Sequence, residues 1–186
     1  MLQQALMSLI LEKRYDAITV EDICNTANIG RSTFYSHYTS KDDLKRRGLE
    51  EHLRRLLVDR QREILTTSGD VKDRSLGFSI TMFEHARDHI DMHRALLGSR
   101  GDAVVHKSIC RILSDVVRNE LNALDNKTNR RRSTDTIPRD LVVQYIVGAY
   151  MAVLTWWLKG GAKIPAQQID PMFRRLVIEG ITPLRS

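Results

Sequence analysis

The apolar residues of this chain recur mainly at intervals of three and four, which is the spacing of one face of an α-helix. Polar segments at 66–73 and 125–138 separate some of these stripes and are predicted to be loops. The pattern therefore predicts an all-α protein of about nine helices. The predicted helices span residues 2–13, 19–27, 31–38, 41–65, 74–90, 92–98, 102–124, 141–158 and 169–181.

The most informative stretch is residues 19–44, which predicts two short helices joined by a tight turn and the start of a third helix. Thr19 is expected to cap the first helix, with Asp22 at the acidic position of a capping box. Asn28 and Gly30 are expected to supply the backbone freedom that the turn needs. A compact helical corner is therefore predicted near the amino end of the chain.

The second short helix carries outward-facing hydrogen-bonding side chains, none of them acidic. Phe34 is expected to hold it by packing, because so short a helix is not stable alone. Such a helix suits the DNA major groove, where base edges present donors, acceptors and thymine methyl groups. Ser40 is expected to cap the next helix, whose amino end would help to hold a phosphate. The outward-facing residues are Arg31, Ser32, Thr33, Tyr35, Ser36 and His37.

This stretch resembles the helix-turn-helix of the TetR/AcrR transcriptional regulators. The resemblance includes the apolar stripe, the turn and the polar residues of IGRSTFYSHYTSK, residues 29–41. It departs from the family pattern at Cys24, where a small alanine is usual, and at residues 28–30, where Asn-Ile-Gly replaces Gly-Val-Ser. The resemblance implies a helix-turn-helix DNA-binding domain at residues 1–47 and a helical effector-binding and dimerisation domain at 48–186.

The resemblance also implies a cytoplasmic homodimer that represses transcription and is released by a small molecule. Two short reading helices held one helical turn apart would read a palindromic operator in double-stranded DNA. Lys41 stands at a helix start, where a cation is unfavourable unless it answers an external phosphate. The expected base contacts are Arg31, Thr33 and Ser36, and the expected phosphate contacts are Thr19, Tyr35, His37 and Lys41, with Ser32 in the same interface.

The segment 141–158 is apolar nearly all round, so it must be buried on every side, in a protein core or in lipid. Gly148 and Ala152 give it the small residues four apart that are found in membrane helices. The amphipathic helix at 169–181 favours instead a four-helix bundle with the same two helices of a second copy, so no membrane partner is expected. The predicted dimer contacts are Tyr150, Leu154, Trp157, Phe173, Leu176 and Val177.

Aromatic and sulfur-bearing side chains in the same half of the chain could line an apolar cavity, although core or dimer contacts would explain them equally well. His85, His89 and His93 have a helical spacing that can align imidazoles for a metal, but a turn near Asp91 would break the alignment. Neither a metal nor a cofactor is expected. The candidate pocket residues for a small apolar or aromatic effector are Phe78, Met82, Phe83, Tyr150 and Trp156.

The net charge of +6 is compatible with an anionic partner. Residues 1–60, however, hold ten Lys or Arg and nine Asp or Glu, a balance of +1, so the prediction of DNA binding rests on where polar groups lie. Cys24 and Cys110 lie in apolar helical contexts and predict buried thiols without a disulfide. No phosphate-binding loop, nucleophile elbow or zinc-protease motif occurs, so an enzyme is not expected. The alternative to a ligand-responsive repressor is an architectural DNA-binding dimer that takes no small ligand.

Overall fold

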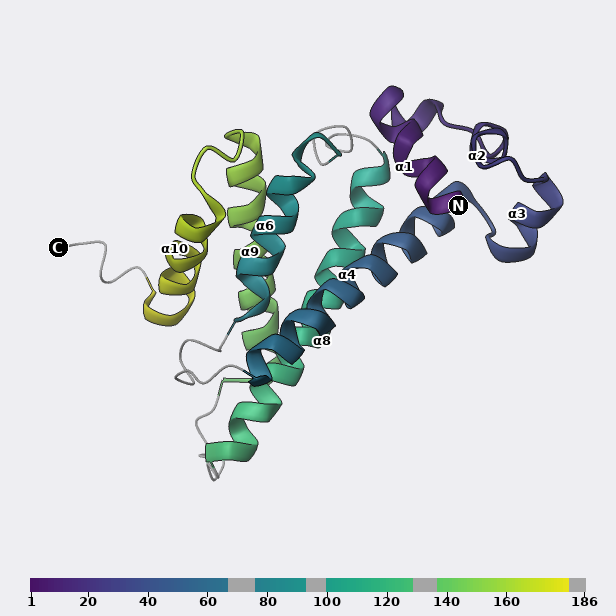
Figure 1. Cartoon of the computed structure of the whole chain (residues 1–186). Helices are drawn as coiled ribbons and strands as arrows, with labels where there is room; N and C mark the ends of the chain where they lie inside the picture. The colour runs from purple at the N-terminus through teal and green to yellow at the C-terminus, as the bar shows by residue number, and fades with distance from the viewer. Residues whose placement is uncertain (67–75, 93–99, 129–136, 181–186) are drawn as a thin grey trace. The chain divides into compact units, whose positions relative to one another are not determined.

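The computed structural model describes residues 1–66, 76–92, 100–128 and 137–180, and the regular structure within these ranges is all helical (Figure 1). The prediction of an all-α fold is confirmed. The helices are α1 (Leu2–Glu12), the 3-10 helix η1 (Tyr15–Ala17), α2 (Val20–Ala27), α3 (Arg31–His37), α4 (Lys41–Thr66), α6 (Phe78–Asp88), α8 (Arg100–Thr128), α9 (Arg139–Lys159) and α10 (Ala166–Glu179).

Some of the predicted segments fall outside the described residues. These are nearly all of the predicted helix at 92–98 and most of the two predicted loops. The first residues of the predicted loop at 125–138 are helical instead, because α8 continues to Thr128. The predicted helix at 74–90 begins later, at Phe78.

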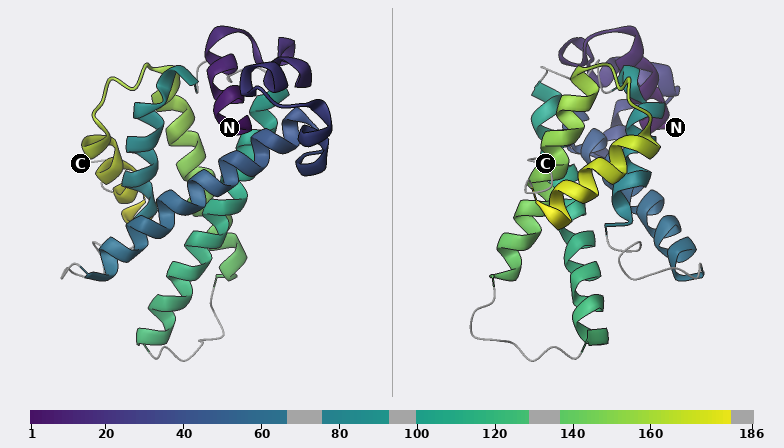
Figure 2. Two further views of the ribbon diagram at one scale, coloured as in Figure 1. Left: turned by 45° about the vertical axis from the view of Figure 1, so that its right-hand side comes forward. Right: turned by 90° about the vertical axis from the view of Figure 1, so that its left-hand side faces the viewer.

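The chain forms two compact units, and α4 and α8 each contribute to both. Unit 1 consists of Met1–Arg55 and His89–Ile109, and unit 2 of Leu56–Asp88 and Cys110–Ser186. In unit 1, α2 packs against both α1 and α3. In unit 2, α6, α9 and α10 pack against one another, and α6 lies beside α9 (Figure 2).

The core of unit 1 is built from the apolar stripes of its short helices. Leu6 and Ile10 of α1, Ile23 of α2 and Phe34 of α3 are each no more than 2% exposed. A helix of seven residues has few internal hydrogen bonds and depends on packing for its stability. The buried ring of Phe34 therefore holds α3 in place, as predicted.

The core of unit 2 is an aromatic cluster contributed by α6, α9 and α10. Phe83 of α6 lies between Tyr150 and Trp157 of α9, with ring centroids 5.0 and 5.5 Å away. Phe173 of α10 lies 5.5 Å from the Tyr150 ring. Trp156 was expected beside this cluster, but its side chain is 62% exposed, and its neighbour Trp157 is the tryptophan that packs inside.

The predicted dimer contacts on α9 and α10 need correction. Tyr150, Leu154, Trp157 and Phe173 are no more than 4% exposed, because they pack inside unit 2, so a second copy cannot reach them. Leu176 and Val177 are partly buried. The apolar or small residues that α9 leaves exposed are Leu141, Tyr145, Gly148, Ala152 and Trp156.

Helix α9 is long and apolar enough to cross a membrane by length and composition alone, and 44% of its most apolar window is buried within the chain. The expectation that this helix is buried on every side is therefore not met by one copy of the chain. Its exposed residues recur at intervals of three and four, so they form one stripe along the helix.

Candidate nucleic-acid interface

Helix α2 begins with the capping box that the sequence predicted. The Thr19 hydroxyl accepts a hydrogen bond from the backbone N–H of Asp22 at 3.1 Å, and the Asp22 carboxylate accepts one from the backbone N–H of Thr19 at 2.8 Å. The Lys13 ammonium lies 2.9 Å from the same carboxylate. The Lys13 contact and then the two Thr19 hydrogen bonds lower the pKa of Asp22 to about 2. This end of α2 is therefore fixed by reciprocal hydrogen bonds.

The turn between α2 and α3 depends on Asn28. Its backbone is left-handed, with φ 53°, and asparagine adopts this conformation more readily than most residues. Gly30 was expected to need the same freedom, but its φ is −74°, which any residue can adopt. A Cβ at Gly30 would meet the Ser32 hydroxyl at 3.7 Å, an ordinary contact. The prediction for Asn28 is confirmed, and that for Gly30 is wrong.

Helix α3 presents its polar residues to solvent, opposite the buried ring of Phe34. Tyr35 is 51% exposed, and its ring packs edge-on against Phe34 at 5.3 Å. The Ser36 hydroxyl donates to the backbone carbonyl of Thr33 at 2.8 Å. This exposed surface, which we call the reading face, has no acidic side chain. It consists of Arg31, Ser32, Thr33, Tyr35, Ser36 and His37.

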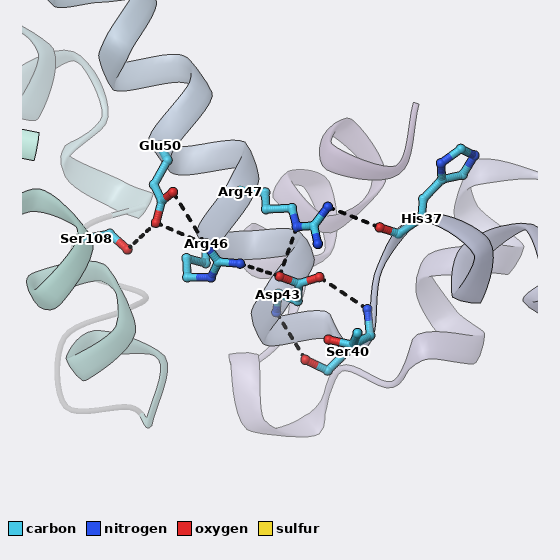
Figure 3. A network of polar contacts seen from close by, with 8 residues as sticks. His37, Ser40, Asp43, Arg46, Arg47, Glu50 and Ser108 are labelled. Carbon is cyan, nitrogen blue, oxygen red and sulfur yellow. Dashed lines mark hydrogen bonds and ion pairs between the residues drawn. The ribbon is translucent and has the colours of Figure 1, made fainter.

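Asp43 organises the start of α4 and its junction with α3 (Figure 3). As predicted, the Ser40 hydroxyl caps α4 by accepting from the backbone N–H of Asp43 at 3.1 Å. The Asp43 carboxylate accepts from the backbone N–H of Thr39 at 3.2 Å, from Arg46 at 2.6 Å and from Arg47 at 3.1 Å. Burial acts to raise the pKa of Asp43, but these donors outweigh it and the pKa is lowered.

Arg47 joins this carboxylate to the end of the reading helix. Its Nη1 donates to the backbone carbonyl of His37 at 3.4 Å, and its guanidinium lies 5.7 Å from the centre of the Tyr38 ring. Carbonyls at a helix end lack partners within the helix, so a cation is favourable there. Arg47 therefore helps to fix the last turn of α3. This role of Arg47 was not predicted from the sequence, although the Ser40-x-x-Asp43 spacing marks Asp43, the carboxylate that Arg47 contacts, as part of a helix cap.

The same network extends to α8 within unit 1. The other guanidinium nitrogen of Arg46 donates to Glu50 at 3.3 Å, and the Ser108 hydroxyl donates to the same carboxylate at 3.3 Å (Figure 3). Hydrogen bonds therefore run continuously from the carboxyl end of α3, along one side of α4, to α8.

Lys41 was expected to point away from the protein toward a DNA phosphate, but its ammonium is bound within the protein. Its ammonium donates to the backbone carbonyls of Tyr15 at 2.9 Å, Asp16 at 3.3 Å and Ile18 at 2.6 Å. An ammonium has three hydrogens, so these carbonyls occupy all of them. Lys41 thus fastens α4 to η1, and it has no hydrogen left for a DNA phosphate in this structure. The Thr19 hydroxyl is similarly engaged, since it donates to Asp22 at 2.8 Å.

Two further expectations concern cysteines and metals. Cys24 is buried, Cys110 is partly buried, and no disulfide joins them. Burial raises the pKa of the Cys110 thiol. No cluster of three metal-binding side chains occurs within residues 1–66, 76–92, 100–128 and 137–180. His93, the third member of the histidine series, lies outside these ranges.

Two family models match the chain. The model of bacterial regulatory proteins of the tetR family matches residues 3–47, which include all of α1 except Leu2, the helices α2 and α3, and the first residues of α4. The model described as a transcriptional regulator C-terminal region matches residues 73–179, more than half of the chain.

Two sequence relatives illustrate the similarity. The transcriptional repressor KstR2 of Mycolicibacterium smegmatis is 24% identical over 194 residues, covering 97% of this chain and 89% of that protein. The uncharacterised regulator YxbF of Bacillus subtilis is 46% identical over 44 residues, which is 23% of this chain and 12% of that protein. The first similarity therefore extends along the whole chain, and the second is confined to a short segment.

Solved structures share the fold. The fatty acid degradation regulator FadR of Bacillus halodurans has a TM-score of 0.72 at 15% identity, covering 96% of this chain and 97% of that one. FadR of Bacillus subtilis, in complex with stearoyl-CoA, has a TM-score of 0.70 at 15% identity and covers 97% of each chain. Members of the matched family bind DNA and act as dimers. The chain therefore belongs to the TetR family and is a DNA-binding transcriptional regulator.

Proposed function

We propose that this regulator is a homodimeric, cytoplasmic repressor that reads a palindromic operator with the reading face of α3 and is released by a small apolar effector. Residues 1–47 would form the DNA-binding domain, and residues 48–186 the effector-binding and dimerisation domain. The observation that carries this proposal is the reading face itself. Its side chains are exposed and not acidic, and Phe34 and Arg47 hold its backbone from behind and at its end.

Within the reading face, we assign base contacts to Arg31, Thr33 and Ser36. Arg31 can form the paired hydrogen bonds to guanine that discriminate best between base pairs. Tyr35 and His37, at the flank and end of the helix, suit phosphates, which fix position without specifying sequence. Ser32 lies in the same surface. We no longer assign Thr19 and Lys41 to phosphates, because their donors serve a helix cap and the α4–η1 junction.

A second copy of the chain is the proposed partner for the exposed stripe of α9. Contiguous exposed apolar surface of this kind marks interaction sites, and a twofold axis would pair the stripe with itself. A Cβ at Gly148 would meet nothing within 4 Å, so the middle of the stripe leaves room for a close approach. Met172 and Ile178 of α10 are also exposed, at 50% and 54%, and would extend the interface.

The effector is proposed to bind in unit 2, which contains the aromatic cluster. An effector can release DNA only if it binds more tightly to a conformation that fits the operator poorly. FadR of Bacillus subtilis was solved with stearoyl-CoA, which has a long apolar acyl chain, and this supports a ligand with an apolar body on this fold. The name of the KstR2 relative supports repression as the direction of control.

Selection of genomic fragments by the purified full-length protein tests the proposed function. We expect the bound fragments to share an inverted repeat, with half-sites about one helical turn, or 10 base pairs, apart. A transcription assay on the recovered promoter should then show less transcript when the protein is added. Fragments with no common sequence would contradict operator recognition and would favour an architectural DNA-binding protein.

A further inference from the structure

The hydroxyl group of Tyr150 is buried and makes no hydrogen bond to any of the residues that the structure describes. The whole residue is 0% exposed. A buried hydroxyl without a partner costs free energy, whereas phenylalanine would fill nearly the same space without that cost. Such a group in a native core needs an explanation. One explanation is that the hydroxyl forms its hydrogen bond to a ligand.

The surroundings of the Tyr150 ring are aromatic. The rings of Phe78, Phe83 and Phe173 lie 5.4, 5.0 and 5.5 Å from it, so α6 and α10 both contribute apolar surface around this side chain. The indole N–H of nearby Trp157 already donates to the backbone carbonyl of Ile164 at 2.8 Å. Tyr150 thus places an unused hydrogen-bond donor beside a cluster of aromatic rings.

The carboxylate of Asp170 acts on the Tyr150 hydroxyl through its charge and already has hydrogen-bond partners of its own. Asp170, which is 7% exposed, accepts hydrogen bonds from the Ser79 hydroxyl and, at 2.8 Å, from Arg174. Burial, and then the negative charge of Asp170, raise the pKa of Tyr150 well above its ordinary value, so the hydroxyl keeps its proton. An anionic group beside the hydroxyl would be repelled by Asp170, whereas a neutral acceptor would not.

We propose that the Tyr150 hydroxyl is the polar contact of the effector site and donates to a neutral oxygen acceptor, such as a carbonyl oxygen, on an otherwise apolar molecule. The body of this molecule would pack against the rings of Phe78, Phe83 and Phe173. The inference rests on the proposed effector response and specifies the chemistry of the effector.

This contact also supplies a reason for a change of conformation. Tyr150 and the three phenylalanines around it are no more than 2% exposed, so the effector must separate side chains of α6, α9 and α10 to enter. In this structure, which we call the closed form, the Tyr150 hydroxyl has no hydrogen-bond partner among the described residues. In the form opened by the bound effector, the hydroxyl would donate to the effector. The effector therefore binds the opened form with a hydrogen bond that the closed form lacks, which is the differential affinity that a population shift requires.

Stability without ligand gives the first test. We would compare the urea midpoint of the full-length protein with that of Tyr150→Phe. The proposal expects Tyr150→Phe to have an unchanged or higher midpoint, because the substitution removes a buried hydroxyl that has no partner among the described residues. A lower midpoint for Tyr150→Phe would show that a water molecule or a protein group satisfies the hydroxyl, and would overturn the proposal.

Calorimetric titration with three probes gives the second test. The probes share the naphthalene ring system and differ in one substituent. Acetylnaphthalene carries a neutral carbonyl, ethylnaphthalene carries no hydrogen-bond acceptor, and naphthoate carries an anionic carboxylate. We expect the ketone to bind the wild type most tightly, and Tyr150→Phe to weaken the ketone about tenfold without affecting the hydrocarbon. A ketone that does not bind, or that binds both proteins equally, would overturn the proposal.

The titration requires no DNA, so its outcome is separate from that of the proposed function. If binding of the ketone depends on Tyr150 but the ketone leaves operator binding unchanged, the Tyr150 contact is supported and the proposal that the effector releases the protein from DNA is contradicted. If operator binding and repression are normal but the ketone does not depend on Tyr150, the repressor proposal remains and this inference is wrong.

Discussion

Glu120 of α8 gives unit 2 a carboxyl group that titrates near neutral pH. It is partly buried, and its Oε2 accepts a hydrogen bond from the backbone N–H of Leu76 at 3.1 Å. Burial raises the pKa of Glu120 from 4.5 to about 7, although the Leu76 hydrogen bond and the charge of Arg174 oppose the rise. The folded protein therefore keeps a proton at pH values where the unfolded chain has lost it.

The sign and size of the effect follow from proton linkage. Because the pKa of Glu120 is higher in the folded state, its protonated form contributes to the stability of the folded protein. This contribution is fully present below pH 4.5 and is lost as the pH rises through about 7. A pKa difference of that size changes the free energy of unfolding by at most about 3 kcal/mol. Since solvent reaches part of the side chain, we expect about 2 kcal/mol. Glu120→Gln keeps an acceptor for Leu76 but does not titrate.

Urea denaturation of the full-length protein at pH 5 and pH 8 measures this contribution. At pH 8 we expect Glu120→Gln to be more stable than the wild type by about 2 kcal/mol, and at pH 5 the difference should nearly vanish. Glu179→Gln, a control at an exposed glutamate of α10, should follow the wild type at both pH values. A Glu120→Gln protein that is less stable than the wild type at pH 8 would refute the reasoning, because the ionised carboxylate would then stabilise the fold.

Three further predictions concern the reading face and the dimer. Phe34→Ala should destabilise unit 1 by about 3–5 kcal/mol, because it empties a fully buried site, and should abolish operator binding, as circular dichroism and gel shift would show. Asp43→Ala should weaken operator binding in fluorescence anisotropy more than Asp88→Ala, since Asp43 holds Arg47 at the end of α3; equal losses would contradict this role. Trp156→Glu should yield monomers in analytical ultracentrifugation, whereas Leu11→Glu, at a residue of similar exposure (61% against 62%), should remain dimeric; two dimeric variants would exclude the α9 stripe.

The features of unit 1 that were predictable from the sequence are local ones. The caps at Thr19 and Ser40 and the left-handed Asn28 depend on neighbours within four residues, so their chemistry is visible in the sequence. The role of Lys41 was not predictable from the sequence, because its partners are backbone carbonyls of Tyr15 and Ile18, more than twenty residues away. Backbone acceptors at that distance leave no mark in the pattern of side chains.

Unit 2 shows a different limit. A helix that is apolar nearly all round gives no sign of which side faces the core of its own chain and which side faces a partner. Tyr150 and Leu154 were therefore predicted at a dimer interface, although they lie on the buried face of α9. Trp156 and Trp157 differ by one position and hence by about 100° around the helix, which is enough to separate an exposed ring from a buried one.

The central claim is that the exposed side of α3 reads DNA sequence. The most direct test is to repeat the genomic selection with Arg31→Ala and with Arg55→Ala, which removes the same charge from an exposed position on α4. The account predicts that Arg31→Ala loses preference at one base pair in each half-site, at a cost of about 1–3 kcal/mol, while Arg55→Ala selects the wild-type consensus. If both variants select the wild-type consensus with equal affinity, Arg31 does not read bases and the assignment of the reading face is wrong.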